Sequence, residues 1–218
     1  MSPRLIGRTA FVAGFVGLVL GPVHALSRYA TDAGAEDLEL PGVRVWADPA
    51  ARVLEPVLTW SDPQTVYLTY GKIWLFVFAA MFAGAFVVRQ GRVAAGLVRG
   101  VERVGWWIAL TGYAVLTVGI AGYWTPWLDG VFAAVLVPGM LVSVIGSLVL
   151  GIGLLRRGVR PLATGILLVA ALPAFFVVSD LVALGAALLP MVWAWGLAGR
   201  DIDRTVSANA VRPEPSHV

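Results

Sequence analysis

One stretch of the sequence decides the fold class of this chain: 66-VYLTYGKIWLFVFAAMFAGAFVV-88. Lys72 is the only residue in this stretch that carries a fixed charge at neutral pH. A helix crosses about 30 Å of hydrocarbon with roughly 17–25 predominantly apolar residues, and this run has both that length and that composition. The stretch therefore predicts a transmembrane helix.

Five more runs have the same character, at residues 9–26, 104–123, 130–155, 161–178 and 181–198. Of the 218 residues, 59% are hydrophobic and only 13% are charged, whereas a soluble domain carries roughly 25% charged residues. We therefore predict an all-α fold, a polytopic transmembrane helical bundle with six spans. Only Ser179 and Asp180 separate the last two runs, so a chain with five spans is the alternative.

The basic residues predict the orientation. If the N-terminus lies inside, the inner segments carry 12 of the 16 basic residues, and only Arg28, Arg44, Arg52 and Lys72 lie toward the outside. The positive-inside rule then places both termini in the cytoplasm of a plasma-membrane protein. This arrangement requires an even number of spans, which favours six. The inner segments are residues 1–8, 89–103, 156–160 and a tail at 199–218 that we expect to be disordered.

The first span has a second interpretation, as a cleaved signal peptide. Arg4 and Arg8 resemble a basic leader, and Val23-His24-Ala25 resembles the small residues before a cleavage site. However, the apolar run is long for a signal peptide, and its glycines are spaced as in packed helices. We therefore expect the first span to be retained.

The segment 27–65 between the first two spans is predicted to form a small extracytoplasmic loop. Residues 37–46 alternate between apolar and polar side chains around Pro41-Gly42, which predicts a short β-hairpin. This hairpin and a following helix would be the only parts of the loop with regular structure.

The phrase Trp-x-Asp-Pro occurs twice in this loop, at residues 46–49 and 60–63. Asp is a strong helix N-cap and Pro suits the first helical position. Asp48-Pro49 is therefore predicted to start a short amphipathic helix on the outer membrane surface, which Pro56 kinks or ends. Asp62-Pro63 is predicted to start the second span.

Polar side chains gather at the predicted outer ends of the spans. Lys72 lies about two turns inside its helix, where a charge needs a partner, a water-filled cleft or a path to the surface. One interpretation is an outward-facing cleft that binds a lipid head group or a small solute; the other is that Lys72 snorkels and the aromatic residues anchor the chain. The residues predicted to line the cleft are His24, Arg28, Tyr70, Lys72, Asp129 and Asp180.

Small residues recur at four-residue spacing on two spans. Such stripes let helix backbones approach closely, because van der Waals contact replaces the hydrophobic force that is absent in lipid. The sequence does not tell whether the two stripes meet within one chain or in a dimer of two copies. The stripe of the first span includes Gly17 and Gly21, and that of the fourth comprises Gly139, Ser143, Ser147 and Gly151.

Several kinds of chemistry find no support in the sequence. The chain has no cysteine, which excludes disulfides and thiolate ligands. It has only two histidines, and no spacing of His, Asp and Glu fits a metal site, so we expect no metal and no cofactor. No hydrolase, metalloprotease or phosphate-loop motif occurs, so no catalytic residue is predicted.

We therefore expect a non-enzymatic integral plasma-membrane protein that acts as an accessory or binding subunit. Its expected partners are membrane lipid and either another membrane subunit or a second copy of this chain. Topology accounts for the basic residues, so we expect no nucleic-acid partner. A small transporter or its substrate-binding component is the first alternative, because prolines interrupt several spans. A lipid-active membrane enzyme is the second.

The orientation can be tested by cysteine labelling, because the chain has no native cysteine. We expect a membrane-impermeant thiol reagent to label Ala33→Cys in intact cells, and to label Ala94→Cys and Ala208→Cys only after permeabilisation. Labelling at position 94 or 208 in intact cells would overturn this topology.

Overall fold

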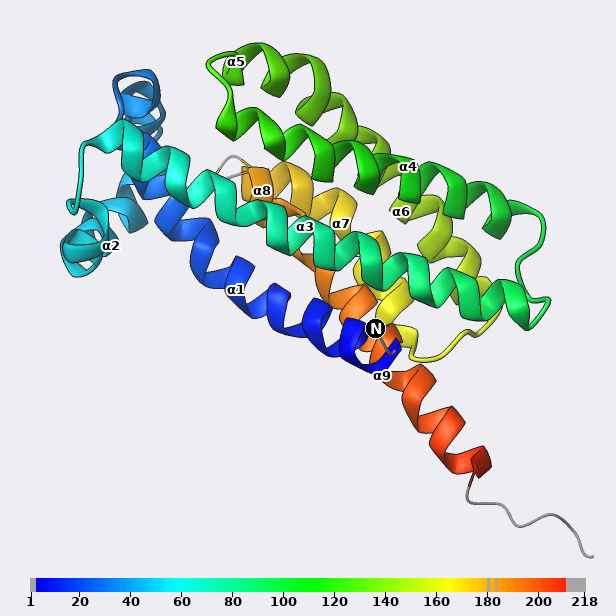
Figure 1. The fold of residues 1–218 in the computed structure, drawn as a ribbon. Helices are drawn as coiled ribbons and strands as arrows, with labels where there is room; N and C mark the ends of the chain where they lie inside the picture. Colours follow the sequence, from blue (N-terminus) through cyan, green and yellow to red (C-terminus); the bar gives the residue numbers. More distant parts are fainter. Residues whose placement is uncertain (1–2, 180, 183, 211–218) are drawn as a thin grey trace, which may run out of the picture.

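The structure is a computed structural model that describes residues 3–179, 181, 182 and 184–210 (Figure 1). Every regular element in these ranges is helical, which agrees with the predicted all-α class. The elements are α1 (Pro3–Tyr29), η1 (Asp32–Glu39), α2 (Pro41–Leu58), α3 (Pro63–Ala94), α4 (Val101–Gly119), η2 (Ile120–Trp124), α5 (Leu128–Val131), η3 (Phe132–Leu136), α6 (Val137–Arg156), α7 (Leu162–Ser179), α8 (Leu184–Ala187) and α9 (Leu189–Ala210).

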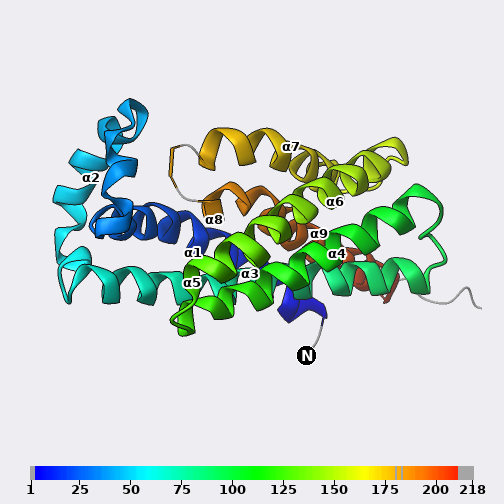
Figure 2. The ribbon, with the colours of Figure 1, turned by 90° about the horizontal axis from the view of Figure 1, so that it is seen from above.

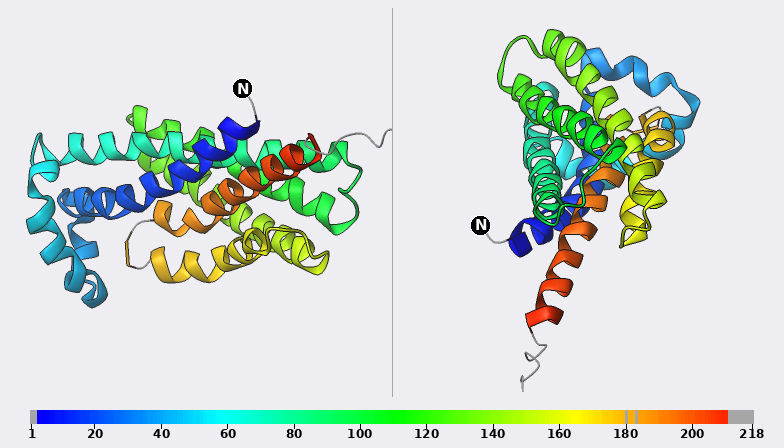
Figure 3. Two further views of the ribbon diagram at one scale, coloured as in Figure 1. Left: turned by 90° about the horizontal axis from the view of Figure 1, so that it is seen from below. Right: turned by 90° about the vertical axis from the view of Figure 1, so that its right-hand side faces the viewer.

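Six long helices run alternately up and down the bundle (Figures 1 and 2). The start of α1 lies beside α9, where Gly7 meets the backbone of Gly199, and Figure 3 shows these two helices side by side. The start of α1 and the part of α9 beside it lie at one end of the bundle. The α3–α4 and α6–α7 connections lie at the same end. The opposite end carries η1 and α2, and we call it the cap end.

Five helical segments are long and apolar enough to cross a membrane: Leu5–Tyr29, Pro63–Ala94, Val101–Trp124, Leu128–Arg156 and Leu162–Ser179. The sixth predicted span, 181–198, falls on α8 and α9 and is not among them. Met191 and Trp195 of α9 are nevertheless fully buried, because α9 packs against α1, α3 and α7. In the tail, α9 stays helical to Ala210, so the expected disorder does not begin at 199, and 211–218 lie outside the described residues.

The segment Phe132–Leu136 (η3) is a π-helical turn within the fourth candidate span. Pro138 follows it and has no N–H to donate to the carbonyl of Ala134, four residues earlier. The wider turn accommodates the missing hydrogen bond, as such turns do inside α-helices. It also brings Phe132 and Leu136 to the cap end of α6.

The β-hairpin predicted at 37–46 is wrong. Residues 32–39 form the 3-10 helix η1, and α2 begins at Pro41, with Leu40 as its N-cap. Val43 and Ala47 are buried against the end of α1. Burial of these two positions, one helical turn apart, outweighs the local alternation of polar and apolar residues.

The helix start predicted at Asp48-Pro49 is also wrong, because both residues lie inside α2. Pro49 cannot donate to the carbonyl of Val45, but the helix tolerates this loss at a residue that is 79% exposed. Pro56 does not end the helix early either, since α2 continues to Leu58. The amphipathic helix itself is present, but it begins eight residues earlier than the sequence suggests, at Pro41 rather than Pro49.

The start predicted at Asp62-Pro63 is confirmed. Pro63 is the first residue of α3, and Asp62 Oδ1 accepts a hydrogen bond from the backbone N–H of Thr65 at 3.0 Å. Hydrogen bonds from the side chain and the backbone of Thr65 lower the pKa of Asp62, because they favour its charged form. The cap fixes where the longest helix of the bundle begins.

The small residues of α6 pack against neighbouring helices of the same chain. Gly139 contacts Val115 of α4, and Ser143 lies against Gly112, where no side chain would fit. The Ser147 hydroxyl is 2.6 Å from the Tyr113 hydroxyl, so a hydrogen bond joins α6 to α4. Gly151 faces α7 at Gly165.

The small residues of α1 face α8 and α9. Gly17 lies against Leu189 at the start of α9, and Gly21 lies against Ala186 of α8. Both stripes therefore pack within one chain, which resolves the question that the sequence leaves open. Close approach of this kind maximises van der Waals contact between helices in lipid.

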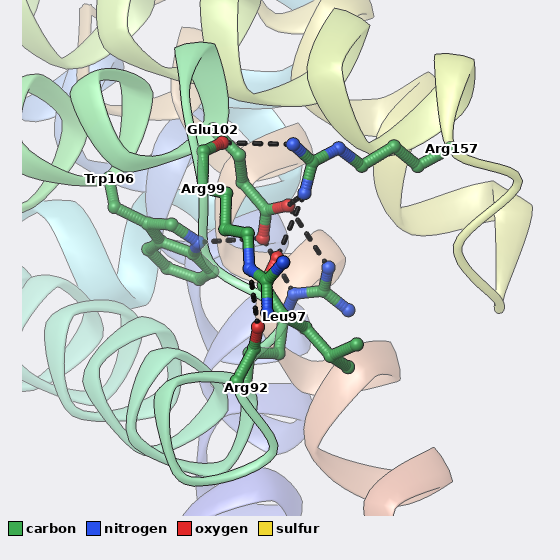
Figure 4. A network of polar contacts seen from close by, with 7 residues as sticks. Arg92, Leu97, Arg99, Glu102, Trp106 and Arg157 are labelled. Atoms are coloured by element: carbon green, nitrogen blue, oxygen red, sulfur yellow. Dashed lines mark hydrogen bonds and ion pairs between the residues drawn. The ribbon is translucent and has the colours of Figure 1, made fainter.

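At the end opposite the cap, Glu102 is buried and binds two arginines (Figure 4). Arg92 of α3 donates to both of its carboxylate oxygens, at 2.7 and 3.1 Å, and Arg157 after α6 donates to Oε2 at 2.8 Å. Trp106 Nε1 also donates to Glu102 Oε1, at 3.2 Å. The carboxylate thus fastens α3, α4 and α6 together at one point.

Arg157 also holds the α3–α4 connection in place. Its two terminal nitrogens donate to the carbonyls of Leu97 and Arg99 at 2.8 and 2.9 Å, as Figure 4 shows. A single guanidinium therefore satisfies two exposed loop carbonyls and one buried carboxylate oxygen. Bonds of this kind, with a charged donor, are roughly twice as strong as neutral ones.

We expect Glu102→Ala to lower the free energy of unfolding by about 3 kcal/mol, because it removes the counter-charge of Arg92, whose side chain is only 14% exposed. Thermal unfolding in maltoside micelles measures the change. Glu55→Ala is the matched control, since Glu55 is exposed on α2 and its carboxylate binds no described residue. Equal melting temperatures for the two variants would contradict this role for Glu102.

Candidate ligand-binding site

A cavity of about 280 Å³ opens at the cap end of the bundle. Its walls come from α1, α3, η2 and the η3–α6 segment, and the connection between α7 and α8 closes one side. The lining residues are His24, Ala25, Arg28, Tyr29, Asp37, Leu40, Val43, Tyr67, Trp74, Phe78, Ile120, Tyr123, Phe132, Leu136, Met140, Ser179, Val182 and Gly185.

Along three of the elements that line the cavity, the polar residues lie nearer the cap than the apolar ones, although Leu40, Val43 and Phe132 add apolar surface on the cap side. On α1, Arg28 lies nearer the cap than His24; on α3, Tyr67 lies nearer the cap than Phe78; and along α4–η2, Tyr123 follows Ile120. The base is completed by Leu136 and Met140. Several independent elements thus carry polar residues toward the cap and apolar residues toward the bundle centre.

His24 is buried in the wall of the cavity with its ring fixed on three sides. Trp74 Nε1 donates to His24 Nδ1 at 3.1 Å, and the ring stacks on Tyr67 with 5.1 Å between centroids. Because an indole N–H can only donate, Nδ1 is an acceptor, and the neutral ring carries its proton on Nε2. Nε2 lies 3.4 Å from the Tyr123 hydroxyl, so this N–H is directed toward Tyr123.

Two glycines make room for the aromatic side chains of the site. The ring of Tyr123 packs directly on Gly71 of α3, and the ring of Trp74 packs on Gly185 at α8. A Cβ at either position would overlap the ring. Tyr67, Gly71, Trp74 and Phe78 follow the spacing of one helix face, which explains why α3 can supply so much of the site.

Arg28 and Asp37 lie at the mouth of the cavity. Arg28 Nε donates to Asp37 Oδ2 at 2.9 Å, and both side chains are about two-fifths exposed, at 43% and 42%. The pair connects the end of α1 to η1. Because only Nε binds Asp37, the two terminal nitrogens of the guanidinium point elsewhere.

Helix α2 forms a roof that is fastened to the α7–α8 connection. Trp46 Nε1 donates to the carbonyl of Leu181 at 2.7 Å, and the Tyr29 hydroxyl donates to the carbonyl of Val182 at 3.0 Å. Val43 of α2 lines the cavity beneath this contact. The roof therefore depends on bonds between segments far apart in the sequence.

The structure brings together only part of the predicted cleft. His24 and Arg28 line the cavity, but Tyr70, Lys72 and Asp129 do not. Tyr70 donates to the carbonyl of Val57 at 2.6 Å, Lys72 lies 5.7 Å from the ring centroid of Trp124, and Asp129 is exposed. Lys72 forms no ion pair with any described carboxylate, and Asp180, its other predicted partner, lies outside the described residues.

The site residues that the sequence analysis did not place in the cleft include Asp37, Tyr67, Trp74 and Tyr123. Trp74 looks like an ordinary apolar residue of a span, and its role depends on meeting His24 of another helix. Asp37 was assigned to a hairpin strand. The seven-residue spacing of Tyr67 and Trp74 was the available signal, because it places both on the helix face that carries Gly71.

A second, more open cavity of about 550 Å³ lies beneath α2. Leu26, Leu38 and Leu58 supply apolar walls, and Asp48 and Glu55 lie on its rim. Both carboxylates are exposed, and no buried polar group is directed into the space. This cavity lacks the fixed polar geometry of the first.

Two common catalytic arrangements are not found among the described residues of the first cavity. Ser27 donates to the backbone carbonyl of His24 at 2.8 Å and is therefore not activated by the imidazole. Within the described ranges, no three His, Asp or Glu side chains gather as metal ligands. Comparison with known proteins gives no match to a protein-family model, a curated protein or a solved structure.

We expect Lys72→Met to change the free energy of unfolding by no more than about 1 kcal/mol, the usual size of an exposed cation–π contact. Its content of bound lipid, measured by native mass spectrometry, is expected to equal that of the unaltered protein, because Lys72 lies outside the cavity. If this variant carries less bound lipid than the unaltered protein, Lys72 contributes to the binding site and this prediction is wrong.

Proposed function

We propose that this protein is a non-enzymatic integral plasma-membrane protein that binds an amphipathic membrane molecule in the cavity at its cap end. The observation that carries this proposal is the polarity of the cavity, with Arg28, Tyr67 and Tyr123 toward the mouth and Phe78, Leu136 and Met140 at the base. A lipid has the same polarity along its length. Pockets of this kind use a few placed polar groups for orientation and apolar walls for affinity.

The same proposal includes the topology. The chain crosses the membrane six times, with α9 as the sixth crossing, both termini in the cytoplasm and the cap outside. The alternating direction of the six long helices and the placement of the arginines support it. Arg92 and Arg157 then lie at the cytoplasmic surface and the cavity opens at the outer leaflet.

A binding or accessory subunit fits better than a transporter. Below the cavity, Trp106, Tyr113 and Trp195 are fully buried, and the Trp195 ring lies against both others, with 5.0 Å between the Trp106 and Trp195 ring centroids. A solute that crosses the bundle would have to displace these large side chains. Transport therefore requires a rearrangement of the core, whereas binding requires none.

Filling the base of the cavity tests this proposal. Leu136 lines the cavity and is 1% exposed, whereas Leu141 lies outside it and is 44% exposed. We expect Leu136→Trp to lose the lipid that co-purifies with the protein, and Leu141→Trp to keep it, as measured by native mass spectrometry and lipid extraction.

Met140→Phe is a second cavity-filling variant, for use if Leu136→Trp fails to fold, which its melting temperature and elution profile will show. The proposal fails if the unaltered protein carries no lipid. It also fails if a folded cavity-filling variant retains as much lipid as Leu141→Trp.

A further inference from the structure

We infer that the ligand of the cap-end cavity is an amphiphile with a single chain and an anionic, oxygen-bearing head group, a carboxylate or a phosphate. This inference rests on the proposed binding function and specifies its ligand. It is carried by the balance of hydrogen-bond donors and acceptors around the cavity mouth, and by the dimensions of the space beneath.

The mouth of the cavity is rich in donors. The terminal nitrogens of Arg28 find no carbonyl or carboxylate acceptor among the described residues. The Tyr67 and Tyr123 hydroxyls are 3.4 Å apart, and Tyr123 is 3.4 Å from His24 Nε2. A good hydrogen bond between hydroxyls is about 2.7–2.8 Å long. These donors therefore have capacity left for an acceptor that enters the cavity.

The other polar groups of the lining are already used. Trp74 donates to His24, Tyr29 donates to Val182, and Ser179 donates to Phe175. Among the described lining residues, Asp37 is the one carboxylate, and it accepts from Arg28 Nε. Among these residues, a ligand head group therefore meets a guanidinium and hydroxyl groups that can donate, but no carboxylate without a partner, which favours an anion over an ammonium group.

Asp37 acts as a positioning residue in this arrangement. By binding Nε, it holds the Arg28 guanidinium at the mouth; the guanidinium also interacts with the Tyr67 hydroxyl, and its terminal nitrogens bind no carbonyl or carboxylate of the described residues. Two parallel N–H groups suit a carboxylate or a phosphate, because both present paired oxygens at matching separation. The neutral donors of Tyr67 and Tyr123 lie on the adjoining wall.

The space beneath the head group has room for one chain. Tyr67 and Phe78 are eleven residues apart on α3, which corresponds to about 16 Å along the helix. The cavity volume of about 280 Å³ lies at the lower end of ligand pockets in proteins, which begin at roughly 300 Å³, so the space suits a ligand with one chain. A lipid with two chains would have to leave one of them outside.

Equilibrium binding of four probes with the same dodecyl chain tests the inference: dodecanoate, dodecyl phosphate, dodecanol and dodecyltrimethylammonium. Each is mixed into maltoside micelles at a fixed mole fraction and titrated into the full-length protein in a calorimeter. We expect the two anions to bind at least about tenfold more tightly than dodecanol, because a hydrogen bond to a charged group contributes more than a neutral one.

Arg28→Gln is expected to remove this preference for anions and leave dodecanol binding unchanged. Arg52→Gln is the matched control, because Arg52 is exposed on α2 and lines neither cavity. If Arg28→Gln fails to fold, the double variant Tyr67→Phe/Tyr123→Phe removes two donors while keeping both rings, and we expect it to weaken anion binding about tenfold.

The outcomes separate this inference from the proposed function. Stronger binding of dodecyl phosphate points to a lysophospholipid as the source, and stronger binding of dodecanoate points to a fatty acid. Equal affinity for dodecanol and the anions, or tightest binding of the ammonium probe, overturns the inference while the cavity remains a lipid site. If no probe binds and Leu136→Trp keeps its lipid, both proposals fall.

Discussion

A bundle surrounded by hydrocarbon has to satisfy its polar groups from within, and this constraint organises the whole structure. At the centre, Trp195 Nε1 donates to the Tyr113 hydroxyl at 3.2 Å, which in turn contacts Ser147 at 2.6 Å. At one end Glu102 is surrounded by two guanidinium groups, and at the other His24 is held by Trp74. Each of these hydrogen-bonded groups joins different helices. The bonds that satisfy the buried polar atoms therefore also hold the helices in their packed positions.

The fold class and most of the helices could be predicted from the sequence, because long apolar runs and arginine placement are local properties. The start of α3 could also be predicted, because an Asp-Pro cap depends on only a few neighbouring residues. The region 32–58 could not. Its local alternation suggests strands, while burial of Val43 and Ala47 against α1 imposes a helix, and that contact is invisible until the helices are assembled.

The candidate site was predicted in outline but not in detail. His24 and Arg28 were found because polar residues near the end of a span are unusual. Lys72 was expected to be central for the same reason, but its side chain lies against Trp124, on a different side of α3 from Tyr67 and Trp74. Charge alone therefore identified the end of the bundle at which the cavity lies. Which side of each helix faces the cavity depended on the packing at Gly71 and Gly185.

The roof over the cavity has a consequence for how quickly a bound molecule can leave. Trp46 of α2 donates to the carbonyl of Leu181 in the α7–α8 connection, so α2 cannot swing away until this bond breaks. Every 1.4 kcal/mol of such resistance lengthens the residence time about tenfold, whatever the ligand's own affinity. For the amphiphile that we propose, release would follow the opening of α2 rather than the strength of its head-group contacts.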